Sequence, residues 1–221
     1  NKFKHKRNHD NIVAKRGALF MIDLKHEVQK RGYTVAHIKT DSIKIPNADQ
    51  KIIDFVFAFG KEYGYDFEHE ATYERMALVN KSVYIAQYEK KGKIVWEATG
   101  AQFAEPFVFK SLFSHEKIEE VDYAITKQVQ EASIYLGDTF IGKVAQVYAS
   151  LSGEEMARVT PDKRSSITGT KGHKWKLFSD YQGKDDIDMD YYNGLVEDAI
   201  KSIEKVGSSS LVIDPFEVSE D

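Results

Sequence analysis

The sequence predicts an α+β fold in which an antiparallel sheet with packed helices is followed by a mainly helical region. Apolar residues recur at helical spacing in two early segments, 10–31 and 49–64. Between these segments, residues 33–46 hold two short apolar runs joined by a polar turn, a pattern typical of a β-hairpin. Residues 67–96 then alternate apolar and polar side chains, which indicates strands.

Each early helix has a start signal and a stop signal. Asp10 is the expected N-cap of the first helix and Gly32 its C-terminal stop. Its predicted core face is Val13, Gly17, Phe20, Leu24 and Val28. Asn47 or Asp49 is expected to cap the second helix, which ends at Gly64. Its predicted core face is Ile52, Phe55, Val56, Phe59 and Tyr63.

The remaining pattern changes from mixed to helical near residues 111–114, where we place a domain boundary between 1–113 and 114–221. Before it, Lys90-Lys91-Gly92-Lys93 is expected to be a turn between strands. After it, one amphipathic helix is predicted from Ile118, Val121, Ile125, Val129 and Ala132, and another from Leu195, Ala199 and Ile203.

Composition indicates an ordered intracellular protein. The chain has 221 residues, is 42% hydrophobic and 30% charged, and can therefore bury a sizeable core beneath a charged surface. It has no cysteine, which excludes disulfides and thiolate metal sites and fits a reducing compartment. No apolar run approaches the ~18 residues of a membrane span. The expected location is the cytoplasm, either associated with the nucleoid or in a phage-infected host, with no membrane partner.

The net charge of −4 is unevenly distributed. Residues 1–16 carry six basic side chains against one acidic side chain, whereas residues 185–221 carry eleven acids against two lysines. Affinity for nucleic acid depends on a local basic surface rather than on total charge, so DNA binding is compatible with this composition. A solvated chain end explains the N-terminal basic cluster equally well.

The tetrapeptide Lys39-Thr40-Asp41-Ser42 places a lone carboxylate at the tip of the predicted hairpin. A hairpin turn is a rigid support because ladder hydrogen bonds fix both flanking strands. These residues are also good turn formers, which explains them without any function. The hairpin alone does not distinguish the two interpretations.

The order of motifs resembles the C-terminal part of phage-type family B DNA polymerases. Those enzymes carry Asp-Thr-Asp-Ser on a palm hairpin, and Lys39-Thr40-Asp41-Ser42 is similar except that Lys39 replaces the first acid. Lys81-Ser82-Val83-Tyr84 resembles the family's Lys-x-x-Tyr element, which contacts the primer-template duplex. Residues 99–103 and 106–110 resemble the end of the palm. The resemblance is strongest over residues 10–113.

This resemblance implies a palm portion over residues 1–113 and a mainly helical, duplex-gripping thumb over residues 114–221. It implies DNA-directed DNA synthesis with two Mg²⁺ ions, one of which activates the primer hydroxyl while the other holds the triphosphate. Asp41 inherits the role of metal ligand. The implied partners are primer-template DNA, dNTP and an upstream polymerase half that carries the exonuclease, the fingers and the first palm Asp.

The resemblance also implies DNA contacts by Lys81 and Tyr84, with Lys110 as a further phosphate contact. A spacing of three in a regular strand puts two side chains on opposite faces, so both contact DNA only if Lys81 lies at the strand entry or at a bulge. One exposed lysine and one core tyrosine is the alternative. Glu74 either assists near the metals or is an ordinary strand glutamate.

A second basic segment, residues 169–176, combines two glycines with Lys171, Lys174 and Lys176. Glycines let backbone amides approach a phosphate, although the P-loop spacing is absent. The resemblance implies that Lys171 and Lys174 contact duplex DNA from a thumb loop. An exposed turn anchored by Trp175 is the alternative.

The acidic residues Asp186, Asp188, Asp190 and Glu197 match several positions of an EF-hand loop, but Tyr191 replaces the glycine that the sharp turn needs. An acidic helix N-terminus explains the same residues. His5 and His9 are expected to be surface histidines.

The predicted function is therefore a fragment or small subunit of a split DNA polymerase, or alternatively a non-catalytic duplex-binding module derived from a polymerase thumb.

Overall fold

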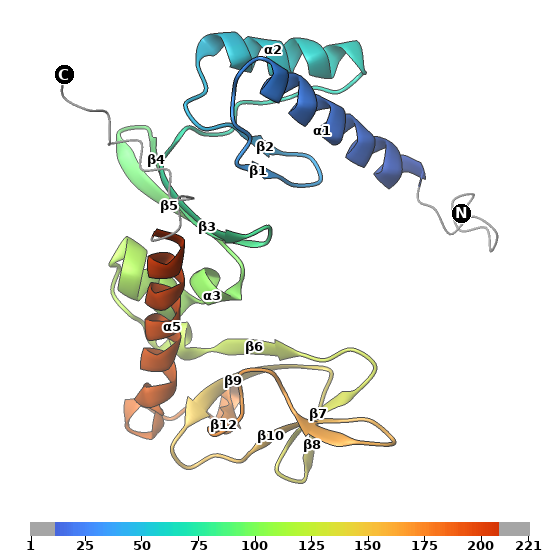
Figure 1. Cartoon of the computed structure of the whole chain (residues 1–221). Helices are drawn as coiled ribbons and strands as arrows, with labels where there is room; N and C mark the ends of the chain where they lie inside the picture. Colours follow the sequence, from blue (N-terminus) through green and yellow to red (C-terminus); the bar gives the residue numbers. More distant parts are fainter. Residues whose placement is uncertain (1–11, 208–221) are drawn as a thin grey trace.

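The computed structural model describes residues 12–207. It is a mixed α+β structure with antiparallel sheets, as predicted. The first part consists of helix α1 (Ile12–Lys30), the hairpin strands β1 (His37–Ile38) and β2 (Ile43–Lys44), and helix α2 (Gln50–Glu62). Figure 1 shows the two helices together above the hairpin.

The first two helices confirm most of the predicted core. α1 buries Phe20, Met21, Leu24 and Val28 against Ile52, Val56 and Phe59 of α2. Val13 and Tyr63, predicted on the core faces of the two helices, are instead exposed. Asp49 rather than Asn47 caps α2, because its side chain accepts the amide hydrogen of Ile52. The expected cap of α1, Asp10, lies outside the described residues.

A three-stranded sheet follows in the order β3 (Tyr73–Asn80), β4 (Val83–Lys90) and β5 (Lys93–Thr99). The predicted turn at residues 90–93 is confirmed, and Lys91 and Gly92 both have positive φ there. The central strand β4 buries Tyr84, Ile85 and Ala86 in succession. Continuous burial means that both faces of the sheet are covered.

Helical turns lie beneath this sheet: α3 (Ala101–Ala104), α4 (Pro106–Phe109) and a π-helical turn, Lys110–Ser114. The long helix α5 (Met189–Gly207) runs beside them and packs on β3, as Figure 1 shows. Ala199 of α5 lies in one core cluster with Ile85, Phe103 and Val108. The end of the described chain therefore stabilises its first half, across the predicted boundary at 113/114. The helix predicted from Leu195, Ala199 and Ile203 is confirmed.

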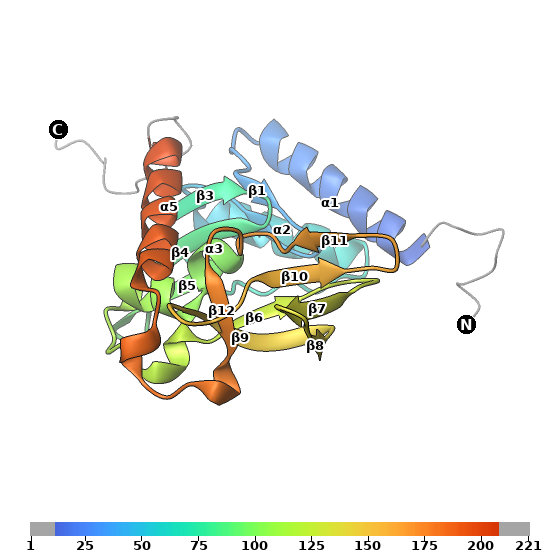
Figure 2. The same ribbon diagram turned by 90° about the horizontal axis from the view of Figure 1, so that it is seen from below.

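The expectation of a mainly helical region after residue 113 is wrong. Seven strands lie there among the described residues: β6 (Ile125–Gln128), β7 (Ser133–Leu136), β8 (Thr139–Gly142), β9 (Val144–Ser150), β10 (Met156–Val159), β11 (Arg164–Ser166) and β12 (Lys174–Leu177). They form two antiparallel sheets, ordered β11-β10-β7-β8 and β12-β9-β6, which face the viewer in Figure 2. Short 3₁₀ turns cover Glu120–Tyr123, Phe178–Asp180 and Lys184–Asp186.

The core of this β region forms around Trp175 and Tyr148, which have 0% and 1% of their surface exposed. Gly153 lies directly against β12, where a Cβ atom would come 2.4 Å from the carbonyl oxygen of Trp175. Only glycine fits that position. The close approach permits the bridge between Glu154 and Trp175 that joins this turn to the sheet.

Candidate functional site

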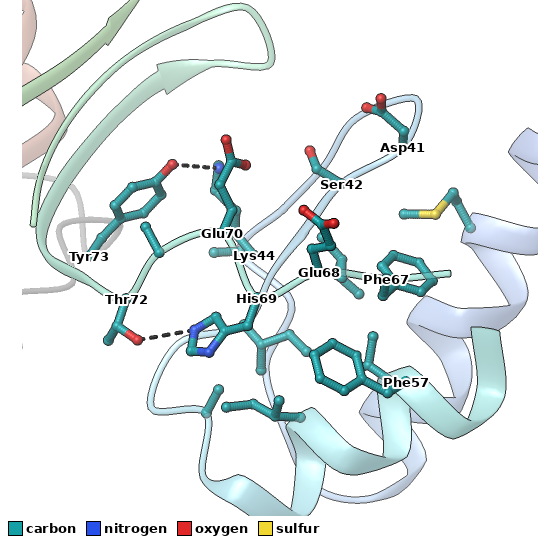
Figure 3. A pocket seen from close by; sticks show the side chains of 18 of the residues that line it. Asp41, Ser42, Lys44, Phe57, Phe67, Glu68, His69, Glu70, Thr72 and Tyr73 are labelled. Carbon is teal, nitrogen blue, oxygen red and sulfur yellow. Dashed lines mark hydrogen bonds between the residues drawn. The ribbon is translucent and has the colours of Figure 1, made fainter. Parts of the chain in front are cut away.

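The turn that carries Asp41 is closed by a hydrogen bond from the Lys39 amide to the Ser42 carbonyl, 2.9 Å long. The flanking strands pair His37 with Lys44 and Ile38 with Ile43. Asp41 is exposed, and Figure 3 shows it at the tip of the hairpin loop. The structure therefore places this carboxylate on a hairpin turn, as predicted.

Two short strands would not hold a turn in place alone, because an isolated hairpin is only marginally stable. Here Ile38, Ile43 and Ile45 pack against the core formed by α1 and α2. The apolar residues of the hairpin thus fix its base, while the polar residues of the turn remain outside. This arrangement positions Asp41 through the base of the hairpin, and within residues 12–207 its carboxylate forms no hydrogen bond or ion pair.

The hairpin borders a pocket of about 830 Å³. Its floor is apolar and includes Phe20, Ile53 and Phe57, whereas the segment Asp66–Glu70 and the turn with Asp41 bring acidic side chains to it. Figure 3 shows Glu68 and Glu70 on the extended segment that runs beside the hairpin. Among residues 12–207, no three His, Asp or Glu side chains come close enough together to hold a metal ion.

A polar cluster behind the hairpin joins it to the three-stranded sheet. The Lys44 ammonium donates to the Tyr73 hydroxyl at 3.2 Å and lies 5.0 Å from the centre of the Tyr84 ring. Both tyrosine hydroxyls donate to Glu97, that of Tyr73 at 3.0 Å. Burial lowers the pKa of Lys44, and the charge of Glu97 opposes that shift. The sequence analysis did not identify this cluster, although Lys44 stands out as a charged residue within an apolar strand pattern.

His37 belongs to the same face of the hairpin as Lys44. It is 7% exposed, and its Nε2 atom has no hydrogen-bond partner among the described residues. Burial lowers its pKa, and the charges of Lys44 and Lys39 lower it further. His37 is therefore a neutral core histidine near neutral pH.

Lys81 and Tyr84 are placed differently from each other. Lys81 is exposed in the turn between β3 and β4, which Asn80 closes by accepting the Ser82 amide at 2.9 Å. Tyr84 is 7% exposed and bonded to Glu97. This is the alternative of one exposed lysine and one core tyrosine. DNA contact by Lys81 stays a prediction, whereas Tyr84 has little surface left for a contact.

Lys110 is held within the protein. Its ammonium lies 2.8 Å from the carboxylate of Asp122, which is buried, and this hydrogen bond raises the pKa of Lys110. A phosphate would have to compete with that ion pair. Glu74 lies on β3 and is half-buried, and it remains compatible with an ordinary strand position.

The loop with Lys171 connects β11 to β12, Lys174 is the first residue of β12, and both lysines are exposed. Trp175, which follows directly, is fully buried. This burial agrees with the alternative of an exposed turn anchored by Trp175. Contact of its lysines with DNA stays a prediction.

The acidic residues Asp186, Asp188 and Asp190 have structural roles within the protein. Asp186 accepts hydrogen bonds from Ser150 and Lys176, and Asp188 lies 2.7 Å from His173 Nδ1. Asp190 lies in the first turn of α5, where the helix dipole favours a negative charge. These contacts support the helix-terminus interpretation rather than an EF-hand. His5 and His9 lie outside the described residues.

No helix between residues 12 and 207 combines the length and the apolar composition needed to cross a membrane. Comparisons with protein-family models, with curated proteins and with solved structures found no match. The evidence for function is therefore the geometry of the chain's own side chains.

Proposed function

We propose that this chain supplies part of the palm and the duplex-contacting region of a DNA-directed DNA polymerase. The observation that carries this proposal is the exposed carboxylate of Asp41, on a hairpin turn whose base is fixed by the core of α1 and α2. A nucleotidyl transferase needs such a carboxylate on a rigid support, because a metal ligand must hold its position while substrates exchange.

A Mg²⁺ site suits hard oxygen ligands and commonly takes one or two carboxylates, with water and phosphate oxygens in its other positions. Asp41 would provide one carboxylate. The magnesium ions would activate the primer hydroxyl and stabilise the leaving pyrophosphate. The residues of this chain position Asp41 and present Lys81, Lys171 and Lys174 to DNA, and an upstream half would supply the second carboxylate and the triphosphate-binding residues.

The test is primer extension by Asp41→Asn in the enzyme reconstituted with its upstream half. We expect a loss greater than about 100-fold, because outer-shell changes already cost 10–100-fold in metal affinity or activity. Binding of the primer-template duplex, measured by fluorescence anisotropy, should stay within about twofold, because no basic surface is altered. Asp23→Asn, an exposed acid on α1, is the matched control. Wild-type extension rates in Asp41→Asn would exclude Asp41 as a metal ligand.

A second candidate is a duplex-binding module without catalysis. Lys39 favours it, because a lysine stands where the related motif has an acid and its charge would oppose a metal ion nearby. Under this alternative, the reconstituted complex binds primer-template DNA but does not extend it. Lys39→Asp would then create no extension activity.

A further inference from the structure

The loop of residues 169–174 has a fixed conformation. The side chain of Thr170 is buried, and its hydroxyl donates to the Ile167 carbonyl at 2.8 Å. The Trp175 indole donates to the Thr170 carbonyl at 3.2 Å, and His173 is held by Asp188. The loop is thus ordered by its own contacts, so it can bind a ligand without first paying the entropy of ordering.

Lys127 of the edge strand β6 lies beneath this loop. Its ammonium is 5.6 Å from the centre of the Trp175 ring, and a Cβ atom on Gly169 would lie 3.9 Å from it. Burial lowers the pKa of Lys127, while the charge of Glu105 opposes that shift. Within the described residues Lys127 forms no hydrogen bond or ion pair. Its interactions there are with the Trp175 ring and with the charge of Glu105, so no hydrogen-bonded anion compensates the half-buried ammonium.

The loop itself adds positive charge and hydrogen-bond donors. Lys171 and Lys174 are exposed and form no ion pair in the part of the chain that the structure describes. The amides of Gly169, Lys171 and Gly172 make no hydrogen bond within the same residues. Gly169 and Gly172 have φ of +74° and +89°, and without a Cβ they leave these amides open to a ligand. Amides exposed in this way can form a concave anion site.

Glu105 is the acidic residue that acts on Lys127, and burial raises the pKa of its carboxyl while Lys127 lowers it. The two charges interact but are not within ion-pair distance of each other. The other acidic residue at the loop, Asp188, is already paired with His173. Among the described acids, Glu105 is therefore the one with which an incoming anion would compete for the Lys127 ammonium.

We propose that Lys127 and the loop Gly169–Lys174 form a phosphate-binding site for the backbone of DNA. Lys127 would contact one phosphate beside the loop amides, and Lys171 and Lys174 would contact the backbone outside it. Such contacts hold a duplex without reading its sequence. The choice of DNA as the source of the phosphate rests on the proposed function, whereas the phosphate site itself rests only on these side chains.

The test is binding of a short fluorescent DNA duplex to the whole chain, measured by anisotropy over a range of KCl concentrations. Lys127→Met keeps the apolar stem against Trp175 and removes the charge. We expect several-fold weaker binding and a slope of log affinity against log salt that is smaller by about 0.9, the value for one lost phosphate contact. The thermal midpoint should not fall, because the variant removes a poorly compensated charge. Lys143→Met, an exposed lysine between β8 and β9, is the matched control and should leave the slope unchanged.

A second variant tests the same site in the opposite direction. Glu105→Gln should strengthen duplex binding, because it removes the carboxylate that competes for Lys127. Unchanged affinity and salt slope in Lys127→Met would overturn the proposal. Inorganic phosphate that raises the thermal midpoint of the parent chain without any duplex binding would overturn the assignment to DNA. Loss of extension in Asp41→Asn is measured separately, so either proposal can fail while the other stands.

Discussion

A single carboxylate, Asp186, joins strand β9, the turn after it, strand β12 and the 3₁₀ turn before α5. It accepts hydrogen bonds from Tyr148 at 2.9 Å, Ser150 at 2.7 Å and Lys176 at 2.9 Å. Ser152 donates to it with both its amide and its hydroxyl. Burial by itself would raise the pKa of Asp186, but these hydrogen bonds outweigh burial and hold the pKa well below its usual range.

This shift predicts the pH dependence of stability. A lowered folded-state pKa stabilises the fold above the unfolded value near 4, and this contribution is lost as the pH falls further. Asp186→Asn should lower the free energy of unfolding at pH 7 by roughly 1–3 kcal/mol, the range for partners left unsatisfied. It should also flatten the decline in stability between about pH 4 and pH 2. Urea unfolding at several pH values measures both effects, with the exposed neighbour Asp185→Asn as the control. Equal acid sensitivity of parent and variant would show that Asp186 is not the responsible group.

The sequence predicts the surroundings of some residues but not of others. The exposure of Asp41 was predictable, because Thr, Asp and Ser in a short turn between apolar runs favour solvent. The contacts that hold Tyr84 and Lys110 within the protein were not predictable, because each is made to one acid elsewhere in the chain. Tyr84 bonds to Glu97, and Lys110 bonds to Asp122. A lysine beside an aromatic run has the same local pattern whether its partner is a phosphate or a carboxylate.

At the scale of elements, residues 118–132 show why a predicted helix was wrong. Ile118, Val121, Ile125 and Val129 fit a helical period, but Ile125 and Val129 also fit a strand in which Lys127 faces the same side. Antiparallel pairing of Ile125–Gln128 with β9 decides the outcome. Val121, which the helix would have buried, is 62% exposed. Long-range pairing of this kind cannot be read from a local window.

Helix α2 is where the cap and the packing were both predictable, and its cap can be tested. The backbone hydrogen bond from Ile52 is the main cause that lowers the pKa of Asp49, and the Tyr33 hydroxyl adds to it. Asp49→Ala should lower the thermal midpoint, and Asp49→Ser should recover part of the loss because serine also caps helices. The difference between parent and Asp49→Ala should shrink as the pH falls below about 4, where the carboxylate is protonated. Identical melting of Asp49→Ala and the parent would mean that the cap adds no stability.

On the scale of the whole molecule, α5 connects the two parts of the described chain. It packs on β3 through Ala199, while Tyr192 at its start donates to the Tyr123 carbonyl at 2.7 Å within the core of the β region. The three-stranded sheet and the β region are thus joined through α5. The hairpin with Asp41 packs in the separate core of α1 and α2, and it meets the sheet through the hydrogen bond from Lys44 to Tyr73. A partner that docks on one part would meet the other at a defined position.

The last prediction concerns that partner. Alone, the chain offers the single carboxylate of Asp41 on its hairpin, so in Mg²⁺ we expect weak binding of primer-template DNA and no nucleotide incorporation. Strand β5 is an edge of the three-stranded sheet, and an unpaired edge favours docking of a complementary chain. Mixing with an upstream half that carries the exonuclease, the fingers and the first palm Asp should therefore restore extension, measured on a labelled primer. Incorporation by the isolated chain would show that the metal ligands are misassigned. Duplex binding without extension in every such mixture would favour the non-catalytic module, because the duplex surface would then be intact while the chemistry of Asp41 is absent.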